Sequence, residues 1–547
     1  MNFFFALAAT AALLVGCGGG GGTGDSSTAA SAVVTISGKI TFDYVPVAVI
    51  SSSSRLDYAN SVRLPARSIA VALIDSATGA ELATAKTSDS GDYSLVGPVG
   101  QSVFVRAYAR LLPVNASTTE ALSVLDNTNA DAQWATDGAA FSPSNGTALT
   151  KNLNASSGWT GTAYNDSQRI AGPFAILDTI YTSMQKIVAV DSSASFQKLS
   201  VHWSPNNIAA SGSLALGQIG NTFYSQTTSG GVVTARHIYI LGKANNDTDE
   251  YDQHVVAHEF GHYLQSVFSR DDSIGGRHGG SDDRLDMRVA FSEGWGNGWS
   301  GYSLGNKFYA DTSGLSQASG YAFDISAGER TNPGWFKEAS VHKIIWDLST
   351  GSIGFSPVWT AMKAGFATSP ALTSAHSFAN TLRINLPSSL STLNMVFGSQ
   401  LITVPSDAYG TGETNFGSPT IAETRPIYNS YGVPGSISNV CVTNAADTSG
   451  AGNKAGEHRY LKLTLPAGAY TFTVARDSAT STAGISTDPD FRVYNPAGAF
   501  LIREASTANT ESASATLVGG NYVLALTDYT FRTSTTLRRP CFDVTVN

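Results

Sequence analysis

The stretch "DEYDQHVVAHEFGHYLQSVF", residues 249–268, carries three histidines spaced four residues apart, His254, His258 and His262. Residues four apart lie on the same face of an α-helix, so a helix here points His258 and His262 in the same direction. Glu259 follows the first of these two histidines, and its side chain is turned by about 100° around the helix axis. We therefore expect one helix to present two imidazoles and one carboxylate to a single site.

The H-E-x-x-H arrangement is the pattern of two zinc ligands and a general base on one helix. A catalytic zinc needs a third protein ligand and an open fourth position. A third histidine ligand in the same run would require a glycine at position 265 and a histidine at position 268, but the sequence has Gln265 and Phe268. The segment "MRVAFSEGWGNGWSGY", residues 287–302, instead offers Glu293 in an apolar surround that favours a helix.

Three other residues remain alternatives for the third ligand. His278, Asp282 and Asp283 lie in the glycine-rich loop "SIGGRHGGSDDR". A metal ligand must come from a rigid element, or the geometry of the site loosens. We therefore favour Glu293, whose apolar neighbours anchor its backbone. His254 is expected to be a hydrogen-bonded residue on a partly buried helix face rather than a ligand.

The strings "HEFGHYLQ" and "AFSEGWGN", which contain these residues, resemble the gluzincin zinc metallopeptidases. The resemblance implies a zincin-like α+β peptidase domain in which Zn²⁺ is held by His258, His262 and Glu293, with Glu259 as general base for peptide-bond hydrolysis. Gluzincins of the thermolysin kind also place an aspartate four residues after the ligand glutamate, as an acceptor for a ligand histidine. Asn297 stands at that position, and its amide oxygen can accept the same hydrogen bond.

Hydrolysis of a peptide bond also needs a second electrophile for the oxyanion, and Tyr302, Tyr321 and His342 are candidates. The β-prone run "ARHIYILGK", residues 235–243, is a candidate for the sheet edge along which an extended protein or peptide substrate pairs. The alternative function is a surface-displayed binding or adhesion protein with an inactive zincin domain. Glu259 favours the enzyme, because an inactive domain has no need of a carboxylate beside the metal.

The chain has 547 residues, which is too long for one core and predicts several domains. Alternating short strands predict a β-sandwich over 32–112, similar to the regulatory-like sandwiches beside secreted carboxypeptidases and surface adhesins. A polar linking region over 113–165 and the peptidase domain over 166–435 follow. The strands "LPAGAYTFTV" and "GGNYVLAL" predict a second β-sandwich over 436–547, which resembles the C-terminal accessory domains of secreted bacterial peptidases. Within the peptidase domain, the apolar spacing predicts a helix over 172–190.

The first residues form an apolar run that ends in "LVGC", which resembles a bacterial lipobox. This predicts a signal peptide over 1–17, lipidation of Cys17 and a flexible tether over 18–31. Ordinary secretion is the alternative. We therefore expect an exported bacterial lipoprotein of the cell envelope, or a secreted protein. Cys441 and Cys541 are expected to form a disulfide in the last domain, with two buried free thiols as the alternative.

The formal net charge of −9 argues against nucleic acid as a partner, because no basic stripe is present to neutralise phosphates. No internal apolar run approaches the ~20 residues of a membrane span, so contact with a membrane is expected through the lipid anchor alone. The hydrophobic share of 42% is enough to build substantial cores. Together these features favour an exported zinc-dependent peptidase.

Overall fold

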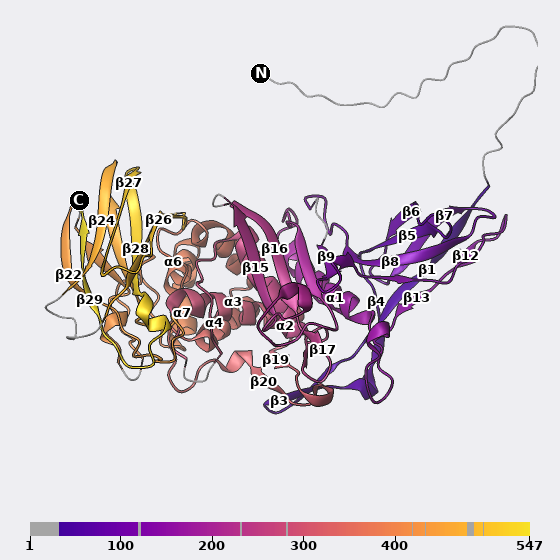
Figure 1. The fold of residues 1–547 in the computed structure, drawn as a ribbon, viewed down its shortest axis with the longest axis horizontal. Helices are drawn as coiled ribbons and strands as arrows, with labels where there is room; N and C mark the ends of the chain where they lie inside the picture. The colour runs from indigo at the N-terminus through magenta and orange to yellow at the C-terminus, as the bar shows by residue number, and fades with distance from the viewer. Residues whose placement is uncertain are drawn as a thin grey trace, which may run out of the picture.

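A computed structural model describes residues 32–547 except 119–121, 230–231, 280–282, 418–419, 433, 478–485 and 496. The expected signal peptide, Cys17 and the tether lie outside these residues, as does Asp282. Figure 1 shows the helices in the middle of the molecule, between the N-terminal strands on one side and the C-terminal strands on the other. Among the described helices, none combines the length and the apolar character that crossing a bilayer requires.

The N-terminal sheet is built around one long strand, β1 (Val33–Tyr44). Its first half pairs with β7 and β12, and its second half with β4 and β13. These partners are β4 (Val62–Pro65), β7 (Asp92–Pro98), β12 (Leu149–Thr150) and β13 (Leu153–Ala155). The sheet therefore draws strands from both ends of the first 155 residues of the sequence.

A nine-stranded sheet continues from the N-terminal region into the centre of the molecule, in the order β15-β16-β14-β9-β8-β5-β6, with β10 and β11 at the side. Its strands are β5 (Ile69–Asp75), β6 (Glu81–Lys86), β8 (Val103–Leu111), β9 (Leu122–Asp126), β10 (Ala132–Gln133), β11 (Ala135–Asp137), β14 (Leu199–Trp203), β15 (Phe223–Ser229) and β16 (Val232–Ile240). β9 pairs in parallel with β14 and antiparallel with β8. The region 113–165 therefore differs from the expected linker, because β9 is an inner strand that joins the two parts.

The described part of the chain contains seven α-helices, and the first two of them contact this sheet. The seven helices are α1 (Ala171–Val190), α2 (Gln253–Phe268), α3 (Met287–Leu304), α4 (Glu338–Thr350), α5 (Phe355–Ala361), α6 (Ala375–Asn385) and α7 (Leu390–Gly398). The helix predicted over 172–190 is confirmed as α1, and its apolar face, which includes Leu177, Ile180 and Met184, is buried. α1 contacts β1, β8 and α2, so it links the first sheets to the helix that carries the paired histidines.

A smaller sheet closes the centre of the molecule from below in Figure 1, in the order β19-β20-β3-β2. Its strands are β2 (Val47–Ile50), β3 (Ser53–Leu56), β19 (Phe308–Asp311) and β20 (Gly320–Asp324). The short pair β17 (Gly242–Lys243) and β18 (Asp247–Thr248) precedes α2. The N-terminal hairpin β2–β3 thus pairs directly with a strand of the central region.

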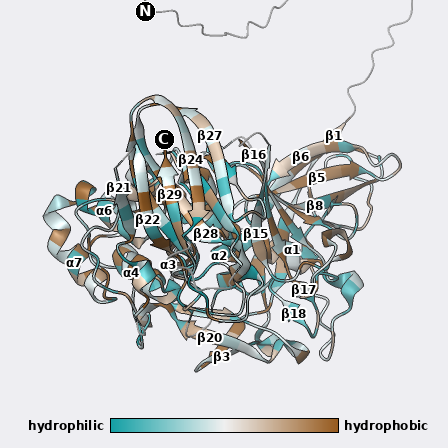
Figure 2. Cartoon of the chain, turned by 60° about the vertical axis from the view of Figure 1, so that its left-hand side comes forward, coloured by the Kyte–Doolittle hydropathy of each residue, from teal (hydrophilic) through white to brown (hydrophobic). Residues whose placement is uncertain are grey.

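The C-terminal region forms two sheets that face each other across a separate apolar core. One sheet contains β21 (Tyr428–Tyr431), β23 (His458–Leu465), β28 (Gly520–Asp528), β25 (Pro489–Tyr494) and β26 (Phe500–Glu504), and the other contains β22 (Gly435–Cys441), β29 (Cys541–Val546), β24 (Gly468–Arg476) and β27 (Thr510–Leu517). Figure 2 shows strands of this region banded between hydrophobic and hydrophilic residues, the pattern of a half-buried strand. Cys441 and Cys541 lie opposite each other on β22 and β29 and form a disulfide.

Candidate metal centre

Glycines let α2 and α3 approach closely, and this approach positions the site. A Cβ atom added at Gly296 of α3 would lie 2.8 Å from the ring of His258, and one added at Gly261 of α2 would lie 3.1 Å from the ring of Trp299. Glycine inside a helix costs about 1 kcal/mol relative to alanine. Gly296 therefore costs helix stability but lets the backbone of α3 lie against His258 of α2, whereas Gly294 and Gly298 face α4.

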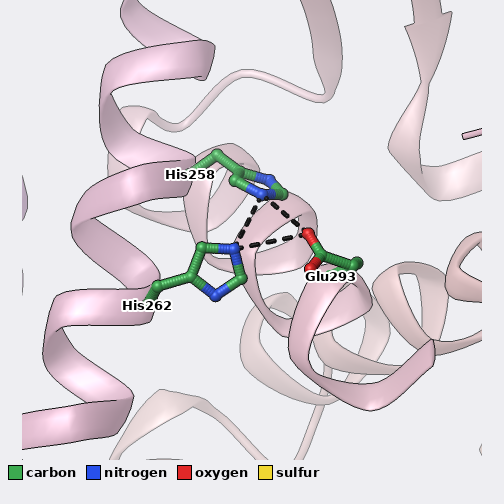
Figure 3. Close-up of side chains that lie close together, drawn as sticks. All are labelled: His258, His262 and Glu293. Carbon is green, nitrogen blue, oxygen red and sulfur yellow. Dashed lines mark hydrogen bonds and ion pairs between the residues drawn. The ribbon is translucent and has the colours of Figure 1, made fainter. Parts of the chain in front are cut away.

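The three expected ligands converge, as Figure 3 shows. The Nε2 atoms of His258 and His262 lie 3.0 Å apart, and the Oε2 atom of Glu293 lies 3.2 Å and 3.3 Å from them. All three side chains are buried, and the group could hold a metal ion. Ligand atoms about 2.0–2.1 Å from a tetrahedral ion are about 3.3–3.4 Å apart, so the spacing and the donor set fit such an ion.

The ring of His258 is held by a chain of hydrogen bonds through Asn297. The Nδ1–H group of His258 donates to Asn297 Oδ1 over 2.8 Å. The amide of Asn297 in turn donates to Oε1 of Glu338 on α4, over 3.1 Å. Glu338 therefore supplies, one hydrogen bond further from His258, the carboxylate that an aspartate at position 297 would supply directly. Because Nδ1 carries the proton, Nε2 of His258 can bind a metal.

Sequence reasoning missed the corresponding support for His262. Its Nδ1–H group donates to Ser292 Oγ over 3.2 Å, and the hydroxyl of Ser292 donates to Asp271 over 3.3 Å. Ser292 directly precedes Glu293 on α3, whereas Asp271 lies in the loop after α2. No spacing rule links these two residues to His262, so the sequence carries no signal for them.

The charges of the ligand group balance one another. Burial opposes a charged imidazole, but the carboxylate of Glu293 outweighs this effect and raises the pKa of His262 to about 9. Burial likewise opposes ionisation of Glu293, but His262 and His278 outweigh it and hold the pKa of Glu293 well below its usual range. A cation that binds here would take the place of the proton on the imidazole.

Glu259 lies beside the ligand group without joining it. Its Oε2 atom accepts the backbone N–H of Tyr224 over 2.7 Å, which fixes the carboxylate against β15. Burial raises the pKa of Glu259, and the neighbouring His258 and His262 partly offset this shift. The contact with Tyr224 also shows that this N–H points away from β16, toward the free side of the sheet.

The edge of the sheet differs from the expectation. The run 235–243 was expected to be the edge strand, but β16 lies inside the sheet between β15 and β14. β15 is the end strand, and no other described strand pairs with its outer side. The sequence of β15, "FYSQTTS", is polar and short, so its hydropathy gives little sign of a strand at this place.

The alternative ligands lie around the site in different roles. Nε2 of His278 is 3.4 Å from Glu293 Oε2, and its Nδ1–H group donates to Glu338 over 3.0 Å, so His278 stands at the rim beside the ligand group. Asp283 pairs with Nζ of Lys454 in the C-terminal region at 2.9 Å. His254 donates to the backbone carbonyl of Asn306 over 3.0 Å, which agrees with the hydrogen-bonded role expected for it.

A cavity of about 670 Å³ opens onto the ligand group, and residues of α2, α3, β15, β19 and β20 line it. Of the three oxyanion candidates, Tyr321 lines this cavity, whereas Tyr302 and His342 do not. Tyr302 stacks on Phe355 away from the site. Tyr309, which sequence reasoning did not select, lines the cavity and lies edge-on to the ring of His258.

A second group that could hold a metal ion consists of carboxylates only. Oxygen atoms of Asp247, Asp249 and Asp311 lie within 4.8 Å of one another. Asp249 and Asp311 line the same cavity as the histidines. α2 begins at Gln253, after Asp252, whose carboxylate accepts hydrogen bonds from Thr312.

Comparison with known proteins adds little to this geometry. No family model matches the chain, and no curated protein matches it. One similar solved structure is the pre-peptidase C-terminal domain of a collagenase from Bacillus anthracis, with 10% identity and a TM-score of 0.16, covering 22% of this chain and 94% of that one. Another is PliG from Aeromonas hydrophila, a periplasmic inhibitor of g-type lysozyme, with 14% identity and a TM-score of 0.15, covering 22% of this chain and 96% of that one. TM-scores this low carry no argument about fold or function.

Proposed function

We propose that this protein is an exported zinc metallopeptidase with a zincin-like central domain. The observation that carries the proposal is the arrangement of His258, His262 and Glu293 at tetrahedral spacing, with Glu259 beside them in an open cavity. Two neutral histidines and one carboxylate are a ligand set that catalytic zinc uses, with the fourth position open. The matching of each histidine Nδ1–H with an acceptor supports the same conclusion.

His258, His262 and Glu293 would hold the zinc, which would lower the pKa of a coordinated water to about 7 and polarise a carbonyl oxygen. Glu259 accepts the proton of the attacking water and delivers it to the leaving amine. The backbone N–H of Tyr224 keeps the carboxylate oriented through both proton transfers.

Other residues around the cavity would bind the peptide substrate and stabilise the oxyanion. β15 offers a backbone edge on which an extended peptide pairs beyond Tyr224, whose own N–H is taken by Glu259, since alternate N–H groups of a strand face the same side. Tyr321 remains an oxyanion candidate and His278 joins it, because both line the cavity and His278 lies 3.4 Å from Glu293. An electrophile at this place stabilises the oxyanion that forms during attack.

The proposed location is the cell envelope, with Cys17 as the lipid-anchored residue, or the extracellular medium. The lipobox-like "LVGC" string and the disulfide between Cys441 and Cys541 support export, since disulfides persist in oxidising compartments. Metabolic labelling with a radioactive fatty acid tests the anchor. We expect label on the wild-type protein and none on Cys17→Ala. An unlabelled wild-type protein would favour the alternative, ordinary secretion without a lipid anchor.

The substitution Glu259→Gln tests the enzyme. It preserves the size of the side chain and removes the proton acceptor, so we expect one zinc per chain as in the wild type and a loss of about 10²–10⁴-fold in kcat. Metal analysis and cleavage of a peptide library measure the two quantities on the same preparation. A zinc-loaded wild-type protein that cleaves no peptide would favour the binding or adhesion protein. Loss of zinc from Glu259→Gln would make Glu259 a ligand.

A further inference from the structure

A second cavity, of about 770 Å³, adjoins the cavity of the metal centre. The walls of the two cavities share Gln226, Asp271 and Ser273. β15 runs along both, with Tyr224 in the first wall and Thr228 in the second. The opposite wall of the second cavity comes from β25, β26 and β28 of the C-terminal sandwich. The edge strand and the sandwich therefore enclose one continuous cleft.

The sandwich wall of this cleft carries unbalanced positive charge. Arg492 on β25 lies directly opposite Arg503 on β26, and Arg532 lines the same cavity. None of the three guanidinium groups forms an ion pair or donates a hydrogen bond to a described residue. Like charges directly opposite each other destabilise a sheet. The carboxylate of Asp490 lies near Arg492 and Arg503 and balances only part of their charge, so the facing arginines are a cost that an anionic ligand would relieve.

The carboxylates of the cavity do not cancel this charge. Asp271 accepts a hydrogen bond from Ser292, and Asp272 pairs with Arg270 at 3.0 Å. Asp490 also lines the cavity, so Asp271 and Asp490 are two carboxylates against the three arginines. Arg288 lines it too, but its guanidinium is already paired with Asp286. The excess charge of the wall is therefore positive.

The sandwich wall is held firmly against the central region. Nζ of the fully buried Lys454 pairs with Asp283, and the backbone of Asp286 donates to the carbonyl of Asn453 over 2.9 Å. The hydroxyl of Tyr460 donates to the carboxylate of Asp286. Apolar residues of the sandwich also belong to the core of the central region. The cavity is thus built by a fixed interface.

We propose that the arginine-lined cavity is a binding site for acidic side chains of an extended polypeptide. This proposal rests on the proposed peptidase function and names its substrate class. A peptide added to β15 runs from Tyr224 toward Thr228, four residues further along, which is about 13 Å at the rise of a strand. Aspartate or glutamate about four residues from the scissile bond would meet Arg492 and Arg503 there.

Binding to the Glu259→Gln protein tests the site without hydrolysis. Two fluorescent peptides are used, one with four consecutive glutamates and one with glutamines in their place, and anisotropy gives their dissociation constants. We expect the acidic peptide to bind more tightly. Arg492→Gln and Arg503→Gln should each weaken it by about fivefold and leave the glutamine peptide unchanged. Arg63→Gln, an exposed arginine on β4 outside both cavities, is the matched control.

Equal binding of the two peptides, or weakening of both by the arginine substitutions, would overturn the proposed site for acidic side chains. Neither result would bear on the proposed peptidase function. In the wild-type enzyme, the same substitutions should raise KM for acidic substrates by about fivefold and leave kcat unchanged. Preferential binding of the acidic peptide by a protein that cleaves nothing would instead overturn the proposed function and keep the site. Thermal melting of each variant confirms that its fold is intact.

Discussion

Two groups of side chains on the same cavity could hold a metal ion, and they differ in how their charges are balanced. In the group of His258, His262 and Glu293, one carboxylate faces two imidazoles, and each Nδ1–H has its own acceptor. The other group, Asp247, Asp249 and Asp311, contains carboxylates alone. Both are close-packed and largely buried, so proximity does not distinguish them.

The difference appears in the pKa values. Burial and the neighbouring Asp311 raise the pKa of Asp247 to about 7, and burial raises that of Asp311 to about 6. Burial and its acidic neighbours also raise the pKa of Asp249. The aspartates therefore share protons, whereas Glu293 stays ionised beside its histidines. The residues that hydrogen-bond to the ligands and balance their charge therefore decide which group is suited to a metal.

The largest expected effect separates the two groups directly. Glu293→Ala should abolish zinc binding and activity, because it removes one of three ligands and the negative charge of the site. Asp311→Asn and Asp283→Ala should leave the zinc content near that of the wild type. Metal analysis of the purified variants is the measurement. If Glu293→Ala kept a full complement of zinc, the ligand group would be wrong and His278 would become the leading alternative.

Asn297→Ala tests whether the hydrogen-bonded support of the histidines matters. The substitution breaks the link between His258 and Glu338, and supporting groups of this kind typically contribute about 10–100-fold to affinity or activity. Asn297→Asp keeps an acceptor and should retain most of the affinity. A chelator competition gives the zinc affinity of both variants, and equal losses in the two would contradict the role assigned to the amide oxygen.

Gly296→Ala tests the close approach of α2 and α3. The added methyl group would lie 2.8 Å from the His258 ring, so the ring or the helix must move. We expect about tenfold weaker zinc binding, from an overpacking strain of about 1–3 kcal/mol. Gly398→Ala at the end of α7 is the control, because its added Cβ meets no atom within 4 Å. Unchanged zinc affinity in Gly296→Ala would show that the helices tolerate a larger separation.

The smallest effect concerns stability and its dependence on pH. Folded aspartates with raised pKa values bind more protons than the unfolded chain between about pH 4 and pH 7, so their contribution to stability falls as the pH rises through this window. Asp311→Asn should therefore raise the free energy of unfolding by about 1–3 kcal/mol at pH 8 and have little effect near pH 4. Denaturant unfolding at the two pH values measures it, and a stabilisation that is equal at both would argue against the titration.

Local spacing predicted the parts of the site that lie on single elements. The interval of four residues placed His258 and His262 on one face of α2, and the apolar period predicted α1. The ring of apolar residues around Glu293 indicated a helix, and that helix is α3. These inferences need only the geometry of one helix, which the residue order determines.

Pairings between distant segments were not predictable in the same way. β9 becomes an inner strand because β8 and β14 lie on either side of it, and its own five residues do not indicate this. Glu338 reaches Asn297 through the packing of α4 on α3, where Gly294 meets Val341. The polar edge strand β15 was missed for the same reason, since its position depends on β16 rather than on its own hydropathy.

The continuous nine-stranded sheet constrains how this protein could have been assembled during evolution. A chain shortened to begin at residue 166 would lose β9 and leave the edge of β14 exposed, which invites aggregation. It would also lose β3, the neighbour of β20. The N-terminal strands and the central region therefore depend on each other. The C-terminal sandwich keeps both of its sheets within its own residues, but Lys454 and Tyr460 bind it to the central region, so replacing it would also have to preserve that interface.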